Sequence, residues 1–135
     1  TRSESHRRHA LDLGADWAGS AGDTPTHPLD RAILFAPAGS LVPAILEKLR
    51  PGGTLAINSV TMSEIPAMPY PVIYGERTLR SVANATREDG VEFLRLAGEI
   101  PLRVDTTEYA LEDANRALQD LKASRLNGEA VLQVR

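Results

Sequence analysis

Apolar residues in this chain form short continuous runs that alternate with segments of helical periodicity. The runs at 31–36 (RAILFA) and 54–58 (TLAIN) have the length of a strand, and a continuous apolar run is typical of a strand buried on both faces. Apolar side chains at helical spacing predict a helix over 39–50, which Pro51-Gly52-Gly53 ends. Alternation of helix and apolar strand predicts right-handed crossovers and a parallel sheet.

Weaker patterns predict the remaining elements. Ser3 can cap a first helix that Gly14 ends, and Thr86 can cap a later helix with Val91, Leu94 and Ala97 facing inward. We further expect strands at 16–20, 78–83, 102–109 and 130–134, and an amphipathic helix at 112–123. The predicted class is therefore α/β: an incomplete doubly wound parallel sheet with a short C-terminal strand-helix-strand segment.

The expectation of an incomplete sheet rests on a missing motif. A doubly wound sheet that binds a dinucleotide usually carries a Gly-rich turn, G-x-G-x-x-G, after its first strand, because bare backbone N–H groups must approach the pyrophosphate. The chain contains no such turn and opens on a helix. We therefore expect the first strand and first crossover to be absent. The alternative is a small α/β domain of another kind, which needs no Gly-rich turn.

The composition of the chain argues against several classes of binding partner. The formal net charge is −3 and the chain is 42% hydrophobic, which argues against nucleic acid or an anionic membrane as a partner, since both need a basic face. No apolar run is long enough to cross a bilayer. The absence of cysteine excludes disulfides and thiolate metal sites and fits a reducing compartment. We expect a cytoplasmic protein.

Five blocks of residues carry a family resemblance. They are SESHRRHALDLGAD (3–16), DRAILFAPAG (30–39), LRPGGTLAINS (49–59), GERTLRSVANATR (75–87) and YALEDANRALQDLKASRLNGEAVL (109–132). In this order and spacing the chain resembles the medium-chain, zinc-type alcohol dehydrogenases. The resemblance implies that 1–99 is part of the dinucleotide-binding (Rossmann) domain and that 100–135 returns to the catalytic domain. It also places the Gly-rich turn and the zinc ligands upstream, so it implies no catalytic residue and no metal ligand here.

The resemblance also implies cofactor contacts at the ends of predicted strands. The implied residues are Thr1, Arg2, Ser3, Pro37, Ala38, Asn58, Ser59, Val60, Val82, Ala83 and Asn84. Members that prefer NAD usually carry an acidic residue where Thr1 stands. A neighbouring Arg2, with Arg7 and Arg8 one helical turn further, favours NADP over NAD because Arg can bind a 2′-phosphate bidentately. The alternatives are a solvated helix start for the arginines and ordinary turns for Pro37, Ala38 and Asn84.

Two histidines stand three residues apart in the first predicted helix. His6 and His9 could present two imidazoles to one metal ion. Arg7 and Arg8 between them would repel a cation, and the sequence offers no evident third ligand. We therefore expect His6 and His9 to face solvent.

The function implied by the resemblance is hydride transfer between an alcohol or aldehyde and NADP (or NAD), with this segment inactive on its own. Zinc would be bound outside the segment. The implied partners are a small-molecule alcohol or aldehyde and a second subunit, through a homodimer or larger assembly at 65–84. One alternative is an S-adenosylmethionine-dependent methyltransferase, which shares the helix-LxPGGxL-strand motif but closes its fold with an antiparallel hairpin. The other is a non-catalytic assembly module.

Overall fold

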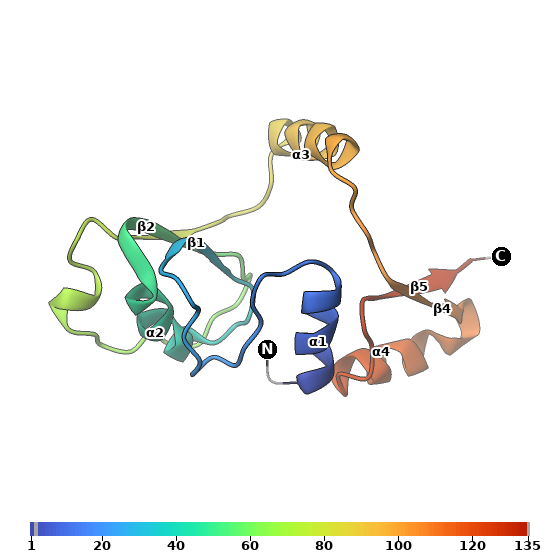
Figure 1. The fold of residues 1–135 in the computed structure, drawn as a ribbon. Helices are drawn as coiled ribbons and strands as arrows, with labels where there is room; N and C mark the ends of the chain where they lie inside the picture. The colour runs from blue at the N-terminus through green and yellow to red at the C-terminus, as the bar shows by residue number, and fades with distance from the viewer. Residues whose placement is uncertain (2, 135) are drawn as a thin grey trace.

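The computed structural model describes residues 1 and 3–134, which form two small parallel sheets (Figure 1). The first sheet contains β1 (Leu29–Leu34), β2 (Leu49–Ile57) and β3 (Thr78–Ser81), in that spatial order. Leu34 pairs with Ile57, and Ile57 pairs with Ser81. The carboxyl ends of the three strands therefore lie together at one end of the sheet, which we call the carboxyl edge. The predicted parallel arrangement is confirmed.

One face of the first sheet carries its hydrophobic core. Helix α2 (Val42–Glu47) follows a short 3₁₀ turn, η1 (Gly39–Leu41), and covers this face. Leu46 and Leu55 are fully buried there. Burying an apolar side chain of this size stabilises a fold by about 1.5–3 kcal/mol.

The predicted helix is shorter than its sequence pattern indicated. It ends at Glu47 with Lys48 as its last cap, and β2 already begins at Leu49. The Pro51-Gly52-Gly53 turn lies within β2 rather than before it. Gly52 adopts a φ of +73°, and the pairing register shifts between Leu29 and Arg31. A left-handed glycine of this kind accommodates extra residues in a strand.

The opposite face of the first sheet is open, so the predicted burial of β1 on both faces is wrong. Ile33 is 60% exposed and Phe35, just after β1, is 65% exposed. Side chains alternate across a strand, and Leu34 between them is buried against the α2 face. Among the described residues no buried contact covers the face that carries Ile33 and Phe35.

Helix α1 (Glu4–Asp12) begins as predicted, and a strand predicted after it is absent. The Ser3 side chain accepts a hydrogen bond from the backbone N–H of His6, and Gly14 follows the helix at a φ of +100°. Residues 16–20 form no strand. A strand needs a neighbouring strand for its backbone hydrogen bonds, and here the N–H of Ser20 donates to the Asp23 carboxylate at 2.7 Å instead.

Helix α3 (Arg87–Glu99) stands apart from both sheets (Figure 1). Thr86 and Asp89 form a reciprocal capping box, which confirms the predicted start. The predicted inward face is wrong, because Val91 is 61% exposed and Leu94 is 71% exposed. Extended segments flank α3 on both sides and carry it away from the described cores, so its apolar side chains have nothing to pack against.

The C-terminal unit is the predicted strand-helix-strand. Strand β4 (Thr106–Ala110) pairs in parallel with β5 (Glu129–Gln133), and α4 (Ala114–Lys122) connects them after a 3₁₀ turn, η3 (Leu111–Asp113). Its small core contains Tyr109, Ala117 and Leu126. The parallel pairing differs from the antiparallel hairpin expected for the methyltransferase alternative. None of the described helices is long and apolar enough to cross a membrane.

Candidate functional site

Three groups of residues follow the three strands of the first sheet at their common carboxyl edge. The backbone N–H of Asn58 donates to the Leu34 carbonyl at 2.9 Å, and the N–H of Val82 donates to the Ile57 carbonyl at 3.0 Å. These bonds continue the ladder one residue beyond each strand. The turn at 36–38, the segment at 58–60 and the segment at 82–84 therefore leave the sheet side by side. Ligands of open α/β sheets bind at this edge.

A pair of hydrogen bonds connects the first two groups. The N–H of Gly39 donates to the Ser63 hydroxyl at 2.8 Å, and the N–H of Ser63 donates to the Pro37 carbonyl at 3.4 Å. The long connection after β2 is thereby held against the turn after β1. Sequence reasoning missed Ser63, because a serine in an irregular stretch gives no signal until its partner in space is known.

The side chains at this edge are open to solvent. Val60 is fully exposed and Val82 is 44% exposed. The Ser59 hydroxyl donates to the Thr61 carbonyl at 2.7 Å, which holds its own segment in a turn. Asn84 adopts a left-handed φ of +83°, a conformation that Asn tolerates better than most residues. The edge thus offers small, apolar and amide groups without a strong charge.

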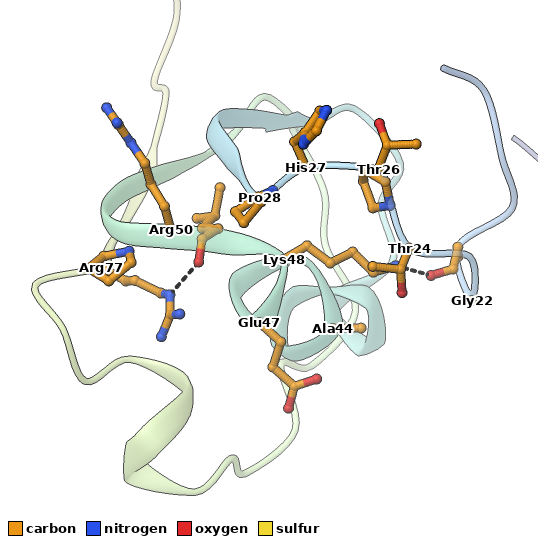
Figure 2. Close-up of a pocket in the computed structure, with 14 residues that line it drawn as sticks. Gly22, Thr24, Thr26, His27, Pro28, Ala44, Glu47, Lys48, Arg50 and Arg77 are labelled. Atoms are coloured by element: carbon orange, nitrogen blue, oxygen red, sulfur yellow. Dashed lines mark hydrogen bonds between the residues drawn. The ribbon is translucent and has the colours of Figure 1, made fainter. Parts of the chain in front are cut away.

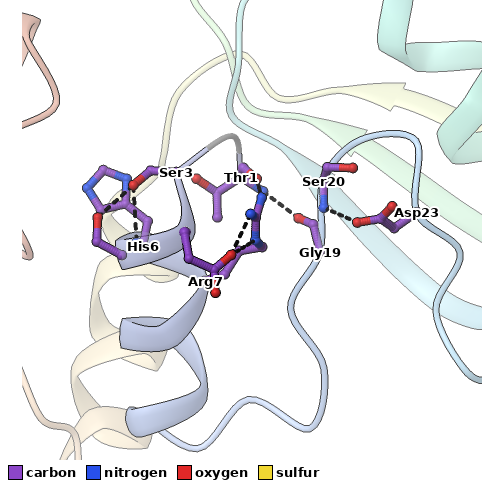
Figure 3. Close-up of polar contacts among 9 residues, drawn as sticks. Thr1, Ser3, His6, Arg7, Gly19, Ser20 and Asp23 are labelled. Atoms are coloured by element: carbon purple, nitrogen blue, oxygen red, sulfur yellow. Dashed lines mark hydrogen bonds and ion pairs between the residues drawn. The ribbon is translucent and has the colours of Figure 1, made fainter.

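The residues predicted at the start of the chain lie on a different segment (Figure 3). The Thr1 amino group donates to the Gly19 carbonyl at 2.8 Å, and the Ser3 hydroxyl shares a 2.6 Å hydrogen bond with that of Ser5. Arg2 lies outside the described residues. No hydrogen bond described for Thr1 or Ser3 connects them to the three groups at the carboxyl edge.

The Arg7 side chain forms hydrogen bonds at the start of its own helix, with Glu4 and with Thr1 just before the helix (Figure 3). Its guanidinium donates to the Glu4 carboxylate at 2.6 and 3.1 Å and to the Thr1 carbonyl at 3.1 Å. The hydrogen bond from Arg7, aided by its charge, lowers the pKa of Glu4 below the usual value. Because Glu4 neutralises this charge, Arg7 contributes less to anion binding than the sequence suggested. Arg8 is exposed.

The two histidines do not face solvent, so that prediction is wrong. His6 Nε2 lies 2.9 Å from the Leu126 carbonyl oxygen, and His9 Nδ1 lies 3.6 Å from an Asp105 carboxylate oxygen. Both rings are part-buried against the C-terminal unit, a contact between residues more than 90 positions apart that the local sequence pattern did not indicate. No group of three or more potential metal-binding side chains occurs among residues 1 and 3–134.

A hollow lies at the opposite end of the first sheet, around the start of β1 and β2 (Figure 2). It has a volume of about 690 Å³ and includes Lys48, Arg50 and Arg77 in its lining. All three cationic side chains form hydrogen bonds or an ion pair with other residues of the chain. Lys48 donates to two backbone carbonyls, Arg77 donates to the Leu49 carbonyl at 2.9 Å among others, and Arg50 pairs with Asp30. These contacts join loops to the sheet, and ligands of α/β sheets bind at the other end of the strands.

Comparison with known proteins identifies relatives along the whole chain. The chain is 46% identical to a Mycobacterium tuberculosis protein named "Probable alcohol dehydrogenase AdhA", over 99% of this chain and 39% of that relative. It therefore spans about 39% of the length of that curated relative. A comparison with models of protein families gave no match.

Solved structures share the fold. A cinnamyl alcohol dehydrogenase of Sorghum bicolor matches with a TM-score of 0.81 and 23% identity, over 96% of this chain and 38% of the other. Bacillus subtilis protein yhfP with NAD bound matches with a TM-score of 0.76 and 19% identity, over 98% of this chain and 45% of the other. At these identities the likeness establishes the α/β fold.

Proposed function

We propose that this chain belongs to the medium-chain alcohol dehydrogenase family and is part of an enzyme that transfers a hydride between an alcohol or aldehyde and a nicotinamide cofactor. The observation that carries the proposal is the 46% identity to an alcohol dehydrogenase over 99% of the chain. Residues 1 and 3–134 show no evident catalytic arrangement of side chains, so the proposed role of the chain is to form one side of the cofactor cleft.

The residues at the carboxyl edge of the first sheet fit the nicotinamide part of such a cofactor. Pro37 and Ala38 would let a ribose approach the backbone, Asn58 to Val60 would flank the nicotinamide ring, and Val82 to Asn84 would offer backbone groups to its carboxamide. The bound cofactor supplies the chemistry by accepting or donating the hydride. The chain would position the cofactor and form a partly apolar wall of its cleft.

NADP is the proposed cofactor in preference to NAD. Thr1 offers no carboxylate to repel a 2′-phosphate, and Arg2, next in the sequence, and Arg8, in the following helix, would provide positive charge for it. The pairing of Arg7 with Glu4 reduces this support, which makes Arg2 the residue on which the preference depends. Thr1 and Ser3 would contact the adenosine half of the cofactor.

The described residues do not fit a zinc site. The sequence has no cysteine, and residues 1 and 3–134 hold no cluster of three or more potential ligands. Zinc in the enzyme would therefore be bound by residues outside this chain, and none of the roles assigned here depends on it.

Cofactor binding by the full-length protein that contains this region tests the proposal. We expect tighter binding of NADPH than of NADH, and Arg2→Ala should weaken NADPH binding by about 1–3 kcal/mol, the loss expected for a charge-assisted hydrogen bond. Arg87→Ala, which removes an exposed charge at the start of α3, is the matched control and should leave both affinities unchanged. A wild-type preference for NADH, or equal losses for both cofactors in Arg2→Ala, would contradict the assignment of NADP. Absence of binding and of turnover with either cofactor would contradict the dehydrogenase itself.

The same proposal includes the organisation of the subunit. Residues 1–99 would belong to the dinucleotide-binding domain and 100–135 to the catalytic domain, in keeping with the separate sheets. Strand β3 pairs with β2 alone among the described strands, and an unpaired strand edge can join that of a twin subunit across a two-fold axis. We place a homodimer contact at 65–84.

The proposed location of the enzyme is the cytoplasm. The absence of cysteine supports it, because disulfides are rare in that reducing compartment.

A further inference from the structure

The contact between α1 and the C-terminal unit depends on two histidine side chains. His6 and His9 are three residues apart and so lie on one face of the helix. The Leu126 carbonyl can only accept, so at 2.9 Å the His6 ring must place its Nε2 proton toward that oxygen. His9 Nδ1 lies 3.6 Å from the Asp105 carboxylate. One histidine therefore meets the segment before β5, and the other meets the segment before β4.

Polar contacts also connect α1 to the first sheet. The loop after α1 is held by Lys48, the cap of α2, whose ammonium donates to the carbonyls of Ala21 and Asp23 at 2.7 and 2.6 Å. Asp23 in turn accepts from the backbone of Ser20. Lys48 thus holds the loop that follows α1 against the end of α2, and the histidines of α1 contact the C-terminal unit.

Apolar burial does not connect the two units. The core of the first sheet and the core around Tyr109, Ala117 and Leu126 share no described residue. Helix α3, which links the units in sequence, buries none of its own residues. A hollow of about 360 Å³ lies between α1 and the C-terminal unit, and its lining consists of His6, His9, Leu121, Ser124, Leu126, Gly128 and Glu129. Two units that share no hydrophobic core are expected to move relative to one another unless specific contacts hold them. The orientation of the C-terminal unit must therefore depend on such contacts.

We propose that His6 and His9 form a latch that fixes the orientation of the C-terminal unit (106–133) relative to α1 and the first sheet. His6 contributes a directional hydrogen bond, and His9 contributes a part-buried ring whose Nδ1 lies 3.6 Å from the Asp105 carboxylate. Asp105 also pairs with Arg103 at 3.3 Å, so the latch at this point is a cluster of three groups. This inference concerns the chain itself and does not depend on the proposed dehydrogenase activity.

Distance measurements between two spin labels test the latch in the full 135-residue chain. The chain has no cysteine, so labels can be placed without background at Glu47→Cys on α2 and Gln119→Cys on α4, both exposed helical positions. The expected result is a single narrow distance distribution in the labelled parent chain. The double variant His6→Ala/His9→Ala should lose that narrow peak and give a broad distribution. Alanine is the best helix former, so α1 should stay helical, and circular dichroism checks this.

Three further variants separate a specific latch from general packing. His27→Ala removes the third histidine, which lies outside the contact, and should keep the narrow peak. His6→Gln keeps an N–H donor and should retain it, whereas His6→Leu keeps the bulk without a donor and should broaden it. A broad distribution in the parent chain, or a narrow one in the double variant with intact helices, would overturn the proposal. Equal behaviour of His6→Gln and His6→Leu would overturn the hydrogen-bond role of His6.

Discussion

The backbone N–H of Gly39 donates a 2.8 Å hydrogen bond to the hydroxyl of Ser63, and this bond joins the turn after β1 to the connection after β2. Gly39 is buried, and the connection passes so close that an added Cβ would lie 2.7 Å from the carbonyl carbon of Glu64 and closer still to the carbonyl oxygens of Ser63 and Glu64. The close approach requires a residue without a side chain. Two of the three groups at the candidate cofactor edge therefore depend on this glycine.

Gly39→Ala should destabilise the chain by about 1–3 kcal/mol, the usual cost of forcing an extra carbon into a packed site. Gly90→Ala is the matched control, because an added Cβ in α3 meets nothing within 4 Å. It should instead stabilise the helix, since glycine in a helix interior costs about 0.5–1 kcal/mol relative to alanine. Urea unfolding measures both changes. A neutral effect of Gly39→Ala would contradict the close approach.

The start of α3 should depend on pH through Asp89. The backbone N–H of Thr86 donates to the Asp89 carboxylate at 2.7 Å, and this hydrogen bond, followed by one from the Thr86 hydroxyl, lowers the pKa of Asp89. A lowered pKa means that the ionised carboxylate stabilises the folded cap above the unfolded value of about 3.9, and that this stability is lost as pH falls through the folded pKa. Amide exchange of residues 87–90 should therefore accelerate below about pH 4. Asp89→Asn, which replaces the titrating carboxylate, should remove this pH dependence, and a profile that stays the same would contradict the assignment.

Tyr109 should ionise later than an ordinary tyrosine. Burial raises its pKa most, and its hydrogen bond of 2.9 Å to Asp120 raises the pKa further because the neighbouring carboxylate opposes a second negative charge. Ultraviolet titration should show tyrosinate formation that extends above pH 10, the reference value. Tyr109→Phe should remove this late component, and Asp120→Asn should shift it to lower pH. Because the folded pKa is raised, the associated stability is present below the unfolded pKa and is lost as pH rises through the folded one.

The purified 135-residue chain should show no alcohol dehydrogenase turnover with either nicotinamide cofactor. The sequence has no Gly-rich turn for the pyrophosphate, and its described residues offer no metal cluster to polarise a substrate oxygen. Absorbance of the reduced cofactor at several chain concentrations measures this directly. Turnover that scales with chain concentration, in a preparation free of contaminating enzyme, would contradict the assignment of catalysis to residues outside this chain.

The chain should form at least a dimer through the segment 65–84. This segment includes β3, which pairs with β2 alone among the described strands, and it carries exposed apolar side chains, among them Ile73 at 37% exposure. Ile73→Asp should shift the chain toward monomer, because a charge in an apolar contact is costly to bury. Val60→Asp adds the same charge at a fully exposed position outside the segment and should not. Light scattering and sedimentation measure the mass, and a stable monomer in the unsubstituted chain would refute the contact.

Several features of the chain follow from the sequence because they depend on neighbours along it. The caps at Ser3 and Thr86 bind backbone amides only three residues away, so a short pattern is enough to place them. The approximate positions of β1 and β2 follow from continuous apolar runs of strand length. The parallel direction of both sheets follows from the long connections between their strands, which contain an α-helix between β1 and β2 and between β4 and β5, and an irregular stretch between β2 and β3.

Tertiary structure alone decided which of the predicted faces is covered. The same apolar alternation that places Leu34 in a core leaves Ile33 and Phe35 exposed, because α2 covers one side of the sheet and no described contact covers the other. The contact of His6 with Leu126 spans 120 residues, and that of Gly39 with Ser63 spans 24. Local patterns fix which residues can form an element and which side of it is apolar. Which segment covers that apolar side depends on how distant parts of the chain meet, and local sequence patterns do not reveal this.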